Sequence, residues 1–210
     1  MRCLYCDKKY QKIRMINLFE DDPLCAECRK KLKGKIRRTR IEGINVYYLY
    51  EYADLFKSAL LQYKEVHDEA LKEIFIYPYG DIARILLKKY KVLYVPSSKK
   101  KYQERNFVPM EKILERYGAM KYADVLMREE LVQANRSLAE RKKMIDNYYI
   151  PKKIDKRDHT LVVDDVLTSG SSLKGVIKAI DNRTKHILIF VLAIVRYDPK
   201  SLNTNKKMLE

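Results

Sequence analysis

The sequence predicts an α/β fold in which a mainly parallel sheet carries helices on both faces, with a small cysteine-bearing element before it. Short apolar runs alternate with segments of helical periodicity across residues 43–198, which is typical of parallel strands joined by helices. All four cysteines, by contrast, lie within the first 28 residues. A chain of 210 residues is long enough for one main domain and such an appendage.

Apolar runs rich in β-branched and aromatic residues predict the strands, at residues 44–50, 92–95, 122–127, 160–163 and 187–196. Helices are expected over residues 55–63, 81–90, 109–117 and 173–180, mainly because apolar residues recur there at helical spacing. The segment 97–107 follows Pro96 and is predicted to be a polar, basic loop. Residues 128–159 show no clear strand period and include Arg128, Gln133, Arg136, Arg141 and Asn147.

The stretch 160–172, T-L-V-V-D-D-V-L-T-S-G-S-S, is the most informative part of the sequence. Its apolar start predicts a buried strand, and Asp164 and Asp165 stand where that strand is expected to end. A helix with one apolar face follows the stretch. The turn between strand and helix consists of small residues, namely Thr168, Ser169, Gly170, Ser171 and Ser172.

Each part of this stretch has a chemical use. Successive backbone N–H groups in a turn, together with a helix N-terminus and side-chain hydroxyls, bind phosphate. Gly170 permits a backbone geometry or a close approach that a side chain would prevent. Carboxylates are good partners for ribose hydroxyls. The stretch therefore predicts a site for a ribose 5-phosphate; the alternative is a strand followed by a capped helix without a ligand.

The cysteines Cys3, Cys6, Cys25 and Cys28 form the pattern C-x2-C-x18-C-x2-C. Two such knuckles suit a tetrahedral Zn²⁺ ion held by four thiolates, which would fold a segment too small for its own core. Disulfides and a redox pair are the alternatives, and a reducing compartment disfavours the former. A closed site of four thiolates has no open position, so we expect no catalysis from it.

A strongly basic segment follows the second knuckle and holds eight basic residues in twelve, without an acid. Two interpretations stay open: phosphate contacts to a nucleic-acid backbone, or a solvated helix and linker. The basic residues are Arg29, Lys30, Lys31, Lys33, Lys35, Arg37, Arg38 and Arg40.

The whole chain is also basic, with 44 Lys and Arg against 28 acids and a net charge of +16. Such a balance indicates an anionic partner, namely nucleic acid, phosphorylated small molecules or anionic lipid, unless it reflects a lysine-rich proteome. The N-terminus lacks the apolar core of a secretory signal, and no apolar run approaches the length of a membrane span. We therefore expect a cytoplasmic protein without a transmembrane segment.

The stretch 160–172 resembles the phosphoribosyl pyrophosphate (PRPP) motif of type I phosphoribosyltransferases, in which two acids and two apolar residues precede T-[ST]-G-x-[ST]. The whole chain resembles the ComF (ComFC-type) family of bacterial competence proteins. That resemblance rests on the cysteine pattern, Tyr63-Lys64, V-P at 95–96, E-R-N-F at 104–107, the segment with Gln133, Arg141 and Asn147, and V-V-D-D-V-L-T-S-G. Asn106 stands where the family usually has glycine, and Asn tolerates a left-handed backbone well.

The resemblance implies a phosphoribosyltransferase-type (Rossmann-like) sheet that binds PRPP with Mg²⁺. It implies that Asp164, Asp165 and residues 168–172 hold the sugar phosphate, and that residues 128–150 include a mobile lid. The residues implied on the pyrophosphate side are Ser97, Ser98, Lys99 and Arg105. From the residues alone, by contrast, Lys64 is expected to be a surface lysine and His67 to be exposed.

The function implied is DNA uptake and processing during natural competence. The implied partners are single-stranded DNA, the competence helicase and recombination mediators. The implied location is the cytoplasm, or the membrane-associated DNA-uptake machinery. Transfer of a pentosyl group to an acceptor is left open. The alternatives are a nucleobase-salvage phosphoribosyltransferase and a non-enzymatic adaptor for single-stranded DNA. The expected units are a zinc element with a basic linker (1–42), a phosphoribosyltransferase-like domain (43–198, with a hood at 43–91 and a core at 92–198) and a polar tail (199–210).

Overall fold

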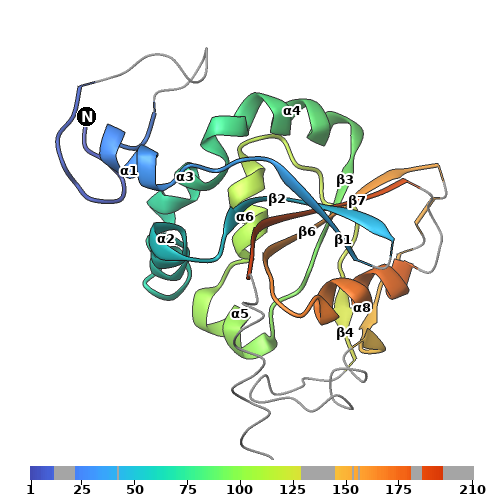
Figure 1. The fold of residues 1–210 in the computed structure, drawn as a ribbon. Coiled ribbons are helices and arrows are strands. Elements are labelled where there is room, and N and C mark those ends of the chain that lie inside the picture. The colour runs from blue at the N-terminus through green and yellow to red at the C-terminus, as the bar shows by residue number, and fades with distance from the viewer. Residues whose placement is uncertain are drawn as a thin grey trace, which may run out of the picture.

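A five-stranded sheet organises the chain in the computed structural model, which describes residues 1–11, 22–41, 43–128, 145–152, 154–155, 157–180 and 186–195 (Figure 1). The strand order is β1-β2-β7-β6-β3, and every neighbouring pair is parallel except β1 with β2. The prediction of a mainly parallel sheet is therefore confirmed. The strands are β1 (Arg37–Ile41), β2 (Ile44–Glu51), β3 (Lys91–Tyr94), β6 (His159–Leu167) and β7 (His186–Ile194).

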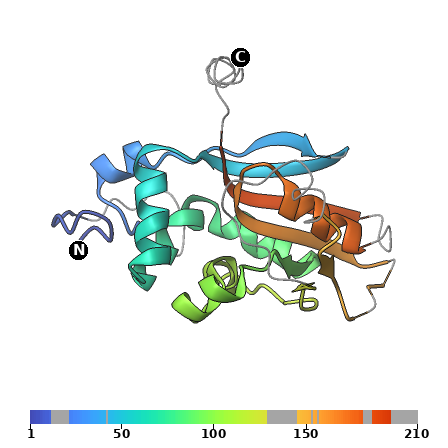
Figure 2. The ribbon, with the colours of Figure 1, turned by 90° about the horizontal axis from the view of Figure 1, so that it is seen from below.

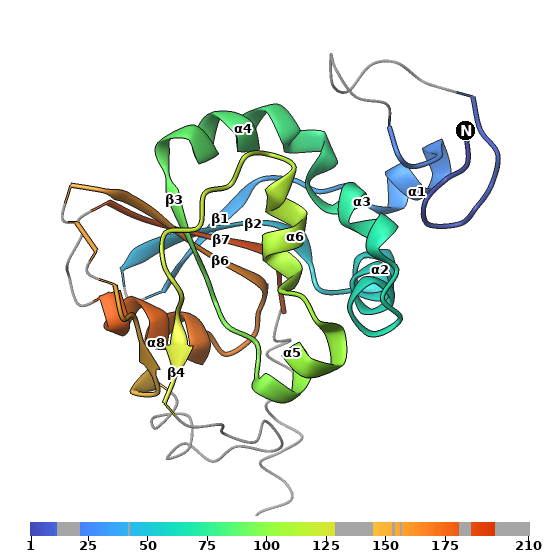
Figure 3. The ribbon, with the colours of Figure 1, turned by 180° about the vertical axis from the view of Figure 1, so that it is seen from behind.

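Helices cover both faces of the sheet, as Figures 1 and 3 show with α4 and α8 on opposite sides. The central strands are apolar at successive positions because each face needs its own core. On β6, Leu161 and Val163 pack into the core beneath α2, α3, α4 and α6, whereas Val162 packs into the core beneath α8. The helices are α1 (Ala26–Lys31), α2 (Asp54–Glu65), α3 (Lys72–Ile76), α4 (Gly80–Lys89), α5 (Lys99–Arg105), α6 (Pro109–Glu115) and α8 (Ser171–Ile180), with short 3₁₀ turns at Glu69–Leu71 and Tyr77–Tyr79.

The edge strand β1 comes from the basic segment that follows the cysteines. Figure 2, seen from below, shows the blue pair β1 and β2 along one edge of the sheet, with the red and orange strands β7 and β6 beyond it. Arg38 and Arg40 on β1 are exposed, while Arg37, Thr39 and Ile41 are half-buried. The segment 37–40 is thus part of the main sheet. Among the described residues, no helix is both long and apolar enough for a membrane crossing.

Two predicted elements differ from the structure. The strand expected at 122–127 is wrong: only β4 (Leu126–Met127) is a strand, and it pairs antiparallel with β5 (Tyr148–Tyr149) in a separate two-stranded sheet. Met120 and Tyr122 do bond to Val92 of β3, but this contact with the main sheet is a single bridge at Lys121. The Tyr122 hydroxyl donates to Asp158 at 2.5 Å and accepts from the Asp155 N–H at 2.7 Å.

The loop predicted at 97–107 is also wrong, because residues Lys99–Arg105 form α5. Ser98 caps this helix, since its hydroxyl accepts from the Lys101 N–H at 3.4 Å. Asn106 ends it with a left-handed backbone at φ 58°, so the tolerance of Asn for this geometry is used as expected.

Several other expectations lie outside the described residues, namely Gln133, Arg136, Arg141, the last position of the strand predicted at 187–196, most of the segment implied as a lid and the tail 199–210. Asn147, from the same stretch as the first three, is described and buried.

Gly175 fixes how closely α8 packs on β5. A Cβ atom at this position would lie 2.7 Å from Cε2 of Tyr148 and 3.2 Å from the backbone oxygen of Ile145. Since α8 begins within the serine-rich turn, this close packing also positions that turn.

We predict that Gly175→Ala lowers the free energy of unfolding by about 1–3 kcal/mol, because overpacking forces shifts in Tyr148 and the backbone. Denaturant unfolding measures the change. Tyr148→Ala removes the clashing ring, so the double variant should lose less than the sum of the two single variants. Strict additivity would contradict this account of the packing.

Candidate functional site

Two adjacent carboxylates lie on β6 near its carboxyl end. The strand continues past them to Leu167, further than expected, and Asp164 pairs in register with Val191 of β7. The Asp165 N–H donates to Oδ1 of Asp164 at 2.8 Å, which fixes the Asp164 side chain against its own backbone. Ligands of parallel sheets bind outside the carboxyl ends of the strands, so this edge is the place to expect a site.

Lys64 is the cation that meets this acidic pair. Its ammonium donates to Oδ2 of Asp165 at 2.6 Å, and the two side chains are only 15% and 19% exposed. The core fixes the position of Lys64, since the preceding residue, Tyr63, is fully buried and donates from its hydroxyl to the Pro109 carbonyl at 3.1 Å. The expectation of a surface lysine is therefore wrong. No local pattern reveals the pair, because its members are 101 residues apart.

The pKa of Asp164 is raised from its ordinary value of 3.8 to about 8, chiefly by burial and then by the neighbouring charge of Asp165. The hydrogen bond from the Asp165 N–H and the more distant charge of Lys64 oppose this rise. The raised pKa favours the protonated form of Asp164 at neutral pH. A protonated carboxyl both donates and accepts hydrogen bonds, which suits a partner with hydroxyl groups.

The small-residue turn lies between this acidic pair and α8. Thr168 and Ser169 are exposed, and the hydroxyls of Ser169 and Ser171 lie 2.9 Å apart. Gly170 is buried with φ 76°, and a Cβ atom there would lie 3.2 Å from Cδ1 of Ile41. Glycine is therefore favoured by both backbone geometry and space. Ser171 and Ser172 form the first turn of α8, where the N–H groups and the helix dipole favour an anion. The Ser171 N–H donates to Oγ of Ser169 at 3.5 Å.

The segment after β3 lies beside the acidic pair, because β3 and β6 are parallel neighbours with Tyr94 paired to Val163. Ser97 and Ser98 are half-buried there, and Lys99 is exposed in the first turn of α5.

Arg105 is placed differently from its neighbours in α5. Its side chain is only 3% exposed and forms an ion pair with Glu65, the residue after Lys64. Its Nε atom is buried with no hydrogen-bond partner among the described residues. Glu65 was not expected at the site, and only the fold reveals it. Consecutive residues of α2 thus contact both sides of the site, since Lys64 pairs with β6 and Glu65 pairs with α5.

The four cysteines converge in space. Their sulfur atoms all lie within 4.8 Å of one another, and the sulfurs of Cys6 and Cys25 are 3.7 Å apart. A tetrahedral site with Zn–S bonds of about 2.3 Å requires sulfur separations of about 3.8 Å. The cluster therefore has the donor atoms and the spacing to hold a metal ion such as zinc.

The basic segment after the cysteines is not uniform. Arg29 is 15% exposed and paired with Asp22, to which its Nε atom donates at 2.9 Å. Arg37 pairs with Glu51 at 2.8 Å, and Nε of Arg40 donates to Asn45 at 3.2 Å. The remaining basic side chains of the segment are all exposed, namely Lys30, Lys31, Lys33, Lys35 and Arg38.

No family model matches the chain. It is 25% identical over 186 residues to the competence protein ComFC of Streptococcus pneumoniae, and the match covers 85% of this chain and 80% of that protein. This similarity supports a ComFC-like family assignment. The ComFC-like resemblance seen in the sequence motifs therefore extends along most of the chain.

Three phosphoribosyltransferases of known structure show low similarity to this chain. A hypoxanthine phosphoribosyltransferase from Staphylococcus aureus has 17% identity and a TM-score of 0.35, covering 61% of this chain and 66% of that one. A purine phosphoribosyltransferase from Pyrococcus horikoshii has 20% identity and a TM-score of 0.34, covering 60% and 77%. An adenine phosphoribosyltransferase has 10% identity and a TM-score of 0.39, covering 80% and 98%.

We predict that Asp164→Asn stabilises the ligand-free protein by an amount that grows as the pH rises from about 4 to about 8. Because the folded-state pKa lies above the unfolded value of 3.8, wild-type folding takes up a proton in this window, and the stability of the wild type falls as the pH increases. The asparagine side chain cannot ionise, so the stability of the variant does not fall with pH for this reason. Denaturant unfolding at pH 5, 7 and 8.5 measures the difference.

Asp158 is the matched control for this prediction, because its pKa is lowered by hydrogen bonds from Lys91 and Tyr122. Its contribution is present above the unfolded pKa, so Asp158→Asn should destabilise the protein at neutral pH. An Asp164→Asn advantage that stays flat from pH 5 to 8.5 would contradict a raised pKa for Asp164.

Proposed function

We propose that the protein binds PRPP at the carboxyl ends of β3 and β6 and acts in the cytoplasm in DNA uptake during natural competence. The observation that carries the proposal is the junction of an acidic pair, a hydroxyl-rich turn and a helix N-terminus at one sheet edge. The similarity to a competence protein ComFC supports the competence role.

Each group has a part in this proposal. Asp164 and Asp165 would hold the ribose hydroxyls, with the protonated Asp164 able to donate as well as accept. Thr168, the serines after it and the first turn of α8 would hold the 5-phosphate. Lys99 would face the pyrophosphate, and Arg105 would reach it by exchanging its present partner, Glu65. A phosphoribosyl transfer would break the bond between ribose C1 and pyrophosphate, and these cations would stabilise the leaving anion.

Carboxylate oxygens are suitable ligands for Mg²⁺. In the free protein, Asp165 forms an ion pair with Lys64 instead. Bound with PRPP, Mg²⁺ would neutralise charge on the pyrophosphate. Lys64 and such an ion would then compete for Asp165, and a displaced Lys64 would be free to pair with a phosphate oxygen. The lysine is accordingly proposed as part of the ligand site.

We also propose that the exposed basic residues 30–35 and 38 contact single-stranded DNA through its phosphates, since five cations share this segment without an acid. Arg29 has a different role, because Asp22 already neutralises it. The competence helicase and recombination proteins are proposed as partners in the same process.

The first experiment is calorimetric titration of PRPP with Mg²⁺ into the full chain. We expect binding, and we expect the affinity to fall at least about tenfold in Asp164→Asn with Asp165→Asn, because the charge-assisted hydrogen bonds of Asp165 to the ribose are lost. Asp155→Asn with Asp158→Asn removes two acids near the opposite end of β6 and should leave the affinity unchanged. Equal affinities in the wild type and the first double variant would refute the site.

For the cysteine cluster we propose a structural zinc ion. Elemental analysis of the purified protein should give about one zinc per chain, in keeping with four thiolate ligands. Cys25→Ser should lose the metal and lower the melting temperature, because the ion would join residues 1–11 to residues 22–32 through four thiolates, three of them buried. Ser58→Ala, on the exposed side of α2, should retain the metal. A wild type free of zinc would end this proposal.

A further inference from the structure

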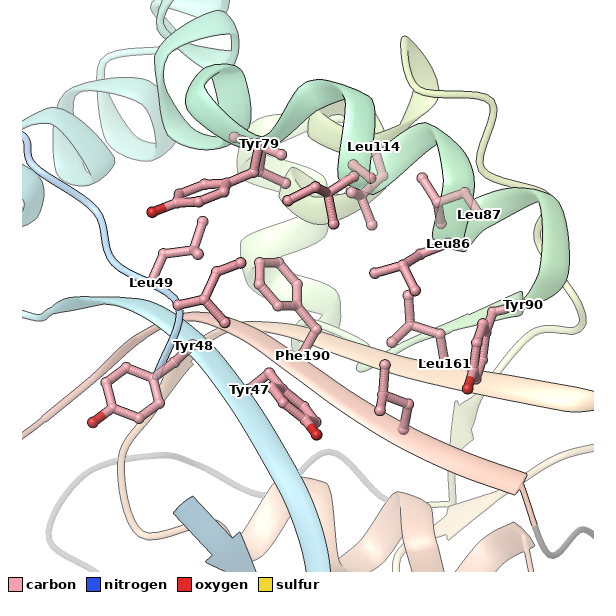
Figure 4. Close-up of a pocket in the computed structure, with 15 residues that line it drawn as sticks. Tyr47, Tyr48, Leu49, Tyr79, Leu86, Leu87, Tyr90, Leu114, Leu161 and Phe190 are labelled. Carbon is pink, nitrogen blue, oxygen red and sulfur yellow. The ribbon is translucent and has the colours of Figure 1, made fainter. Parts of the chain in front are cut away.

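An apolar groove lies between α4 and the face of the sheet, away from the acidic pair. It has a volume of about 350 Å³, and its lining consists of apolar and tyrosine side chains. Figure 4 shows Leu86 and Leu87 of α4 on one side of it and Tyr47 and Phe190 of the strands on the other. It meets β6 at Leu161, which is about 10 Å along the strand from Asp164. The groove is therefore separate from the proposed PRPP site.

The apolar surface continues outside the hollow. On α4, Ile82, Ile85 and Leu86 lie at helical spacing along one side and are 47%, 70% and 39% exposed. Ile36, across the groove, is 45% exposed. Ile85 does not line the hollow at all. A small apolar ligand would fill only the hollow, whereas a helix laid along α4 would cover both the hollow and the exposed stripe.

The rim of the groove is positive. Lys88 and Lys89 follow the lining residue Leu87, and Lys35 precedes Ile36; all three lysines are exposed. Asp81, at the start of α4, is paired with Arg84 at 3.1 Å. The groove is thus apolar at its centre, and the three lysines next to its lining residues have no acidic partner in the part of the chain that the structure describes. A second copy of this chain seated on the same face would bring like charges together.

We propose that this groove is the docking site for an amphipathic helix of a partner protein, whose apolar face enters the groove and whose flanking residues are acidic. Apolar anchors at i, i+3, i+4 and i+7 would match a groove that runs beside α4. Acidic flanks would meet Lys35, Lys88 and Lys89 and would select this partner from other apolar helices. The proposal does not depend on PRPP binding.

The test measures binding of two fluorescent helical peptides to the full chain by anisotropy. Both carry leucine at i, i+3, i+4 and i+7; one has glutamate at the other positions and its control has lysine there. We expect the glutamate peptide to bind at least about tenfold more tightly at 0.1 M salt. Ile85→Glu should weaken it about tenfold or more. Ile85 is largely exposed, so this variant should keep the wild-type melting temperature.

Charge reversal completes the test. Lys88→Glu with Lys89→Glu should shift the preference toward the lysine peptide, whereas Lys178→Glu on α8 should leave it unchanged. Equal binding of both peptides, or binding of neither, overturns the proposal. Binding of palmitate without binding of the glutamate peptide assigns the groove to a small amphiphile and overturns it too. Self-association in sedimentation velocity that Ile85→Glu abolishes would assign the face to copies of this chain instead.

Discussion

The ion pair between Lys64 and Asp165 is the constraint on which the site depends. Two carboxylates on adjacent residues of a largely buried strand repel each other and lose solvation, so the strand needs a proton or a cation there. Both are provided for: the raised pKa of Asp164 favours its protonated form, and Lys64 faces Asp165. The pair forms because apolar residues of α2, including Phe56, Leu60 and Tyr63, dock that helix with its last turn over the end of β6. Core packing therefore determines the electrostatics of the site.

The same turn of α2 serves the other half of the site. Glu65 pairs with Arg105 at the end of α5, so adjacent residues of opposite charge contact the two elements that flank the proposed ligand. Each of these charges has an opposite charge beside it in the free protein, although Nε of Arg105 has no hydrogen-bond partner among the described residues. PRPP bound with Mg²⁺ could exchange partners with both ion pairs: its phosphates would take Lys64 and Arg105, and its metal ion would take Asp165. The total charge of the site would then stay balanced. Such an exchange costs less than uncovering isolated buried charges.

The sequence predicts the parts of this structure that depend on local pattern. The parallel sheet, α2, α6, α8 and the cysteine cluster all follow from periodicity or spacing, and the left-handed position of Asn106 follows from its residue type. The helix α5 has no such pattern, because serine, lysine and glutamine residues near its start are equally common in loops. The segment 122–127 has the composition of a strand because Tyr122 and Val125 are buried in the same core as Val162, yet it meets the main sheet only at a single bridge to Val92. The contacts of Lys64 and Glu65 need the tertiary fold, which no short window contains.

The two edges of the main sheet are protected from pairing with other strands in different ways. At the β3 edge, backbone hydrogen bonds join Val92 to Met120 and Tyr122, so a short piece of the chain itself covers the strand. At the β1 edge, the exposed Arg38 and Arg40 alternate along the strand. Unprotected edges of apolar sheets recruit strands from other molecules, and charged side chains on an edge discourage such growth. The arginines of β1 therefore give this chain resistance to edge-to-edge aggregation, whatever else they contact.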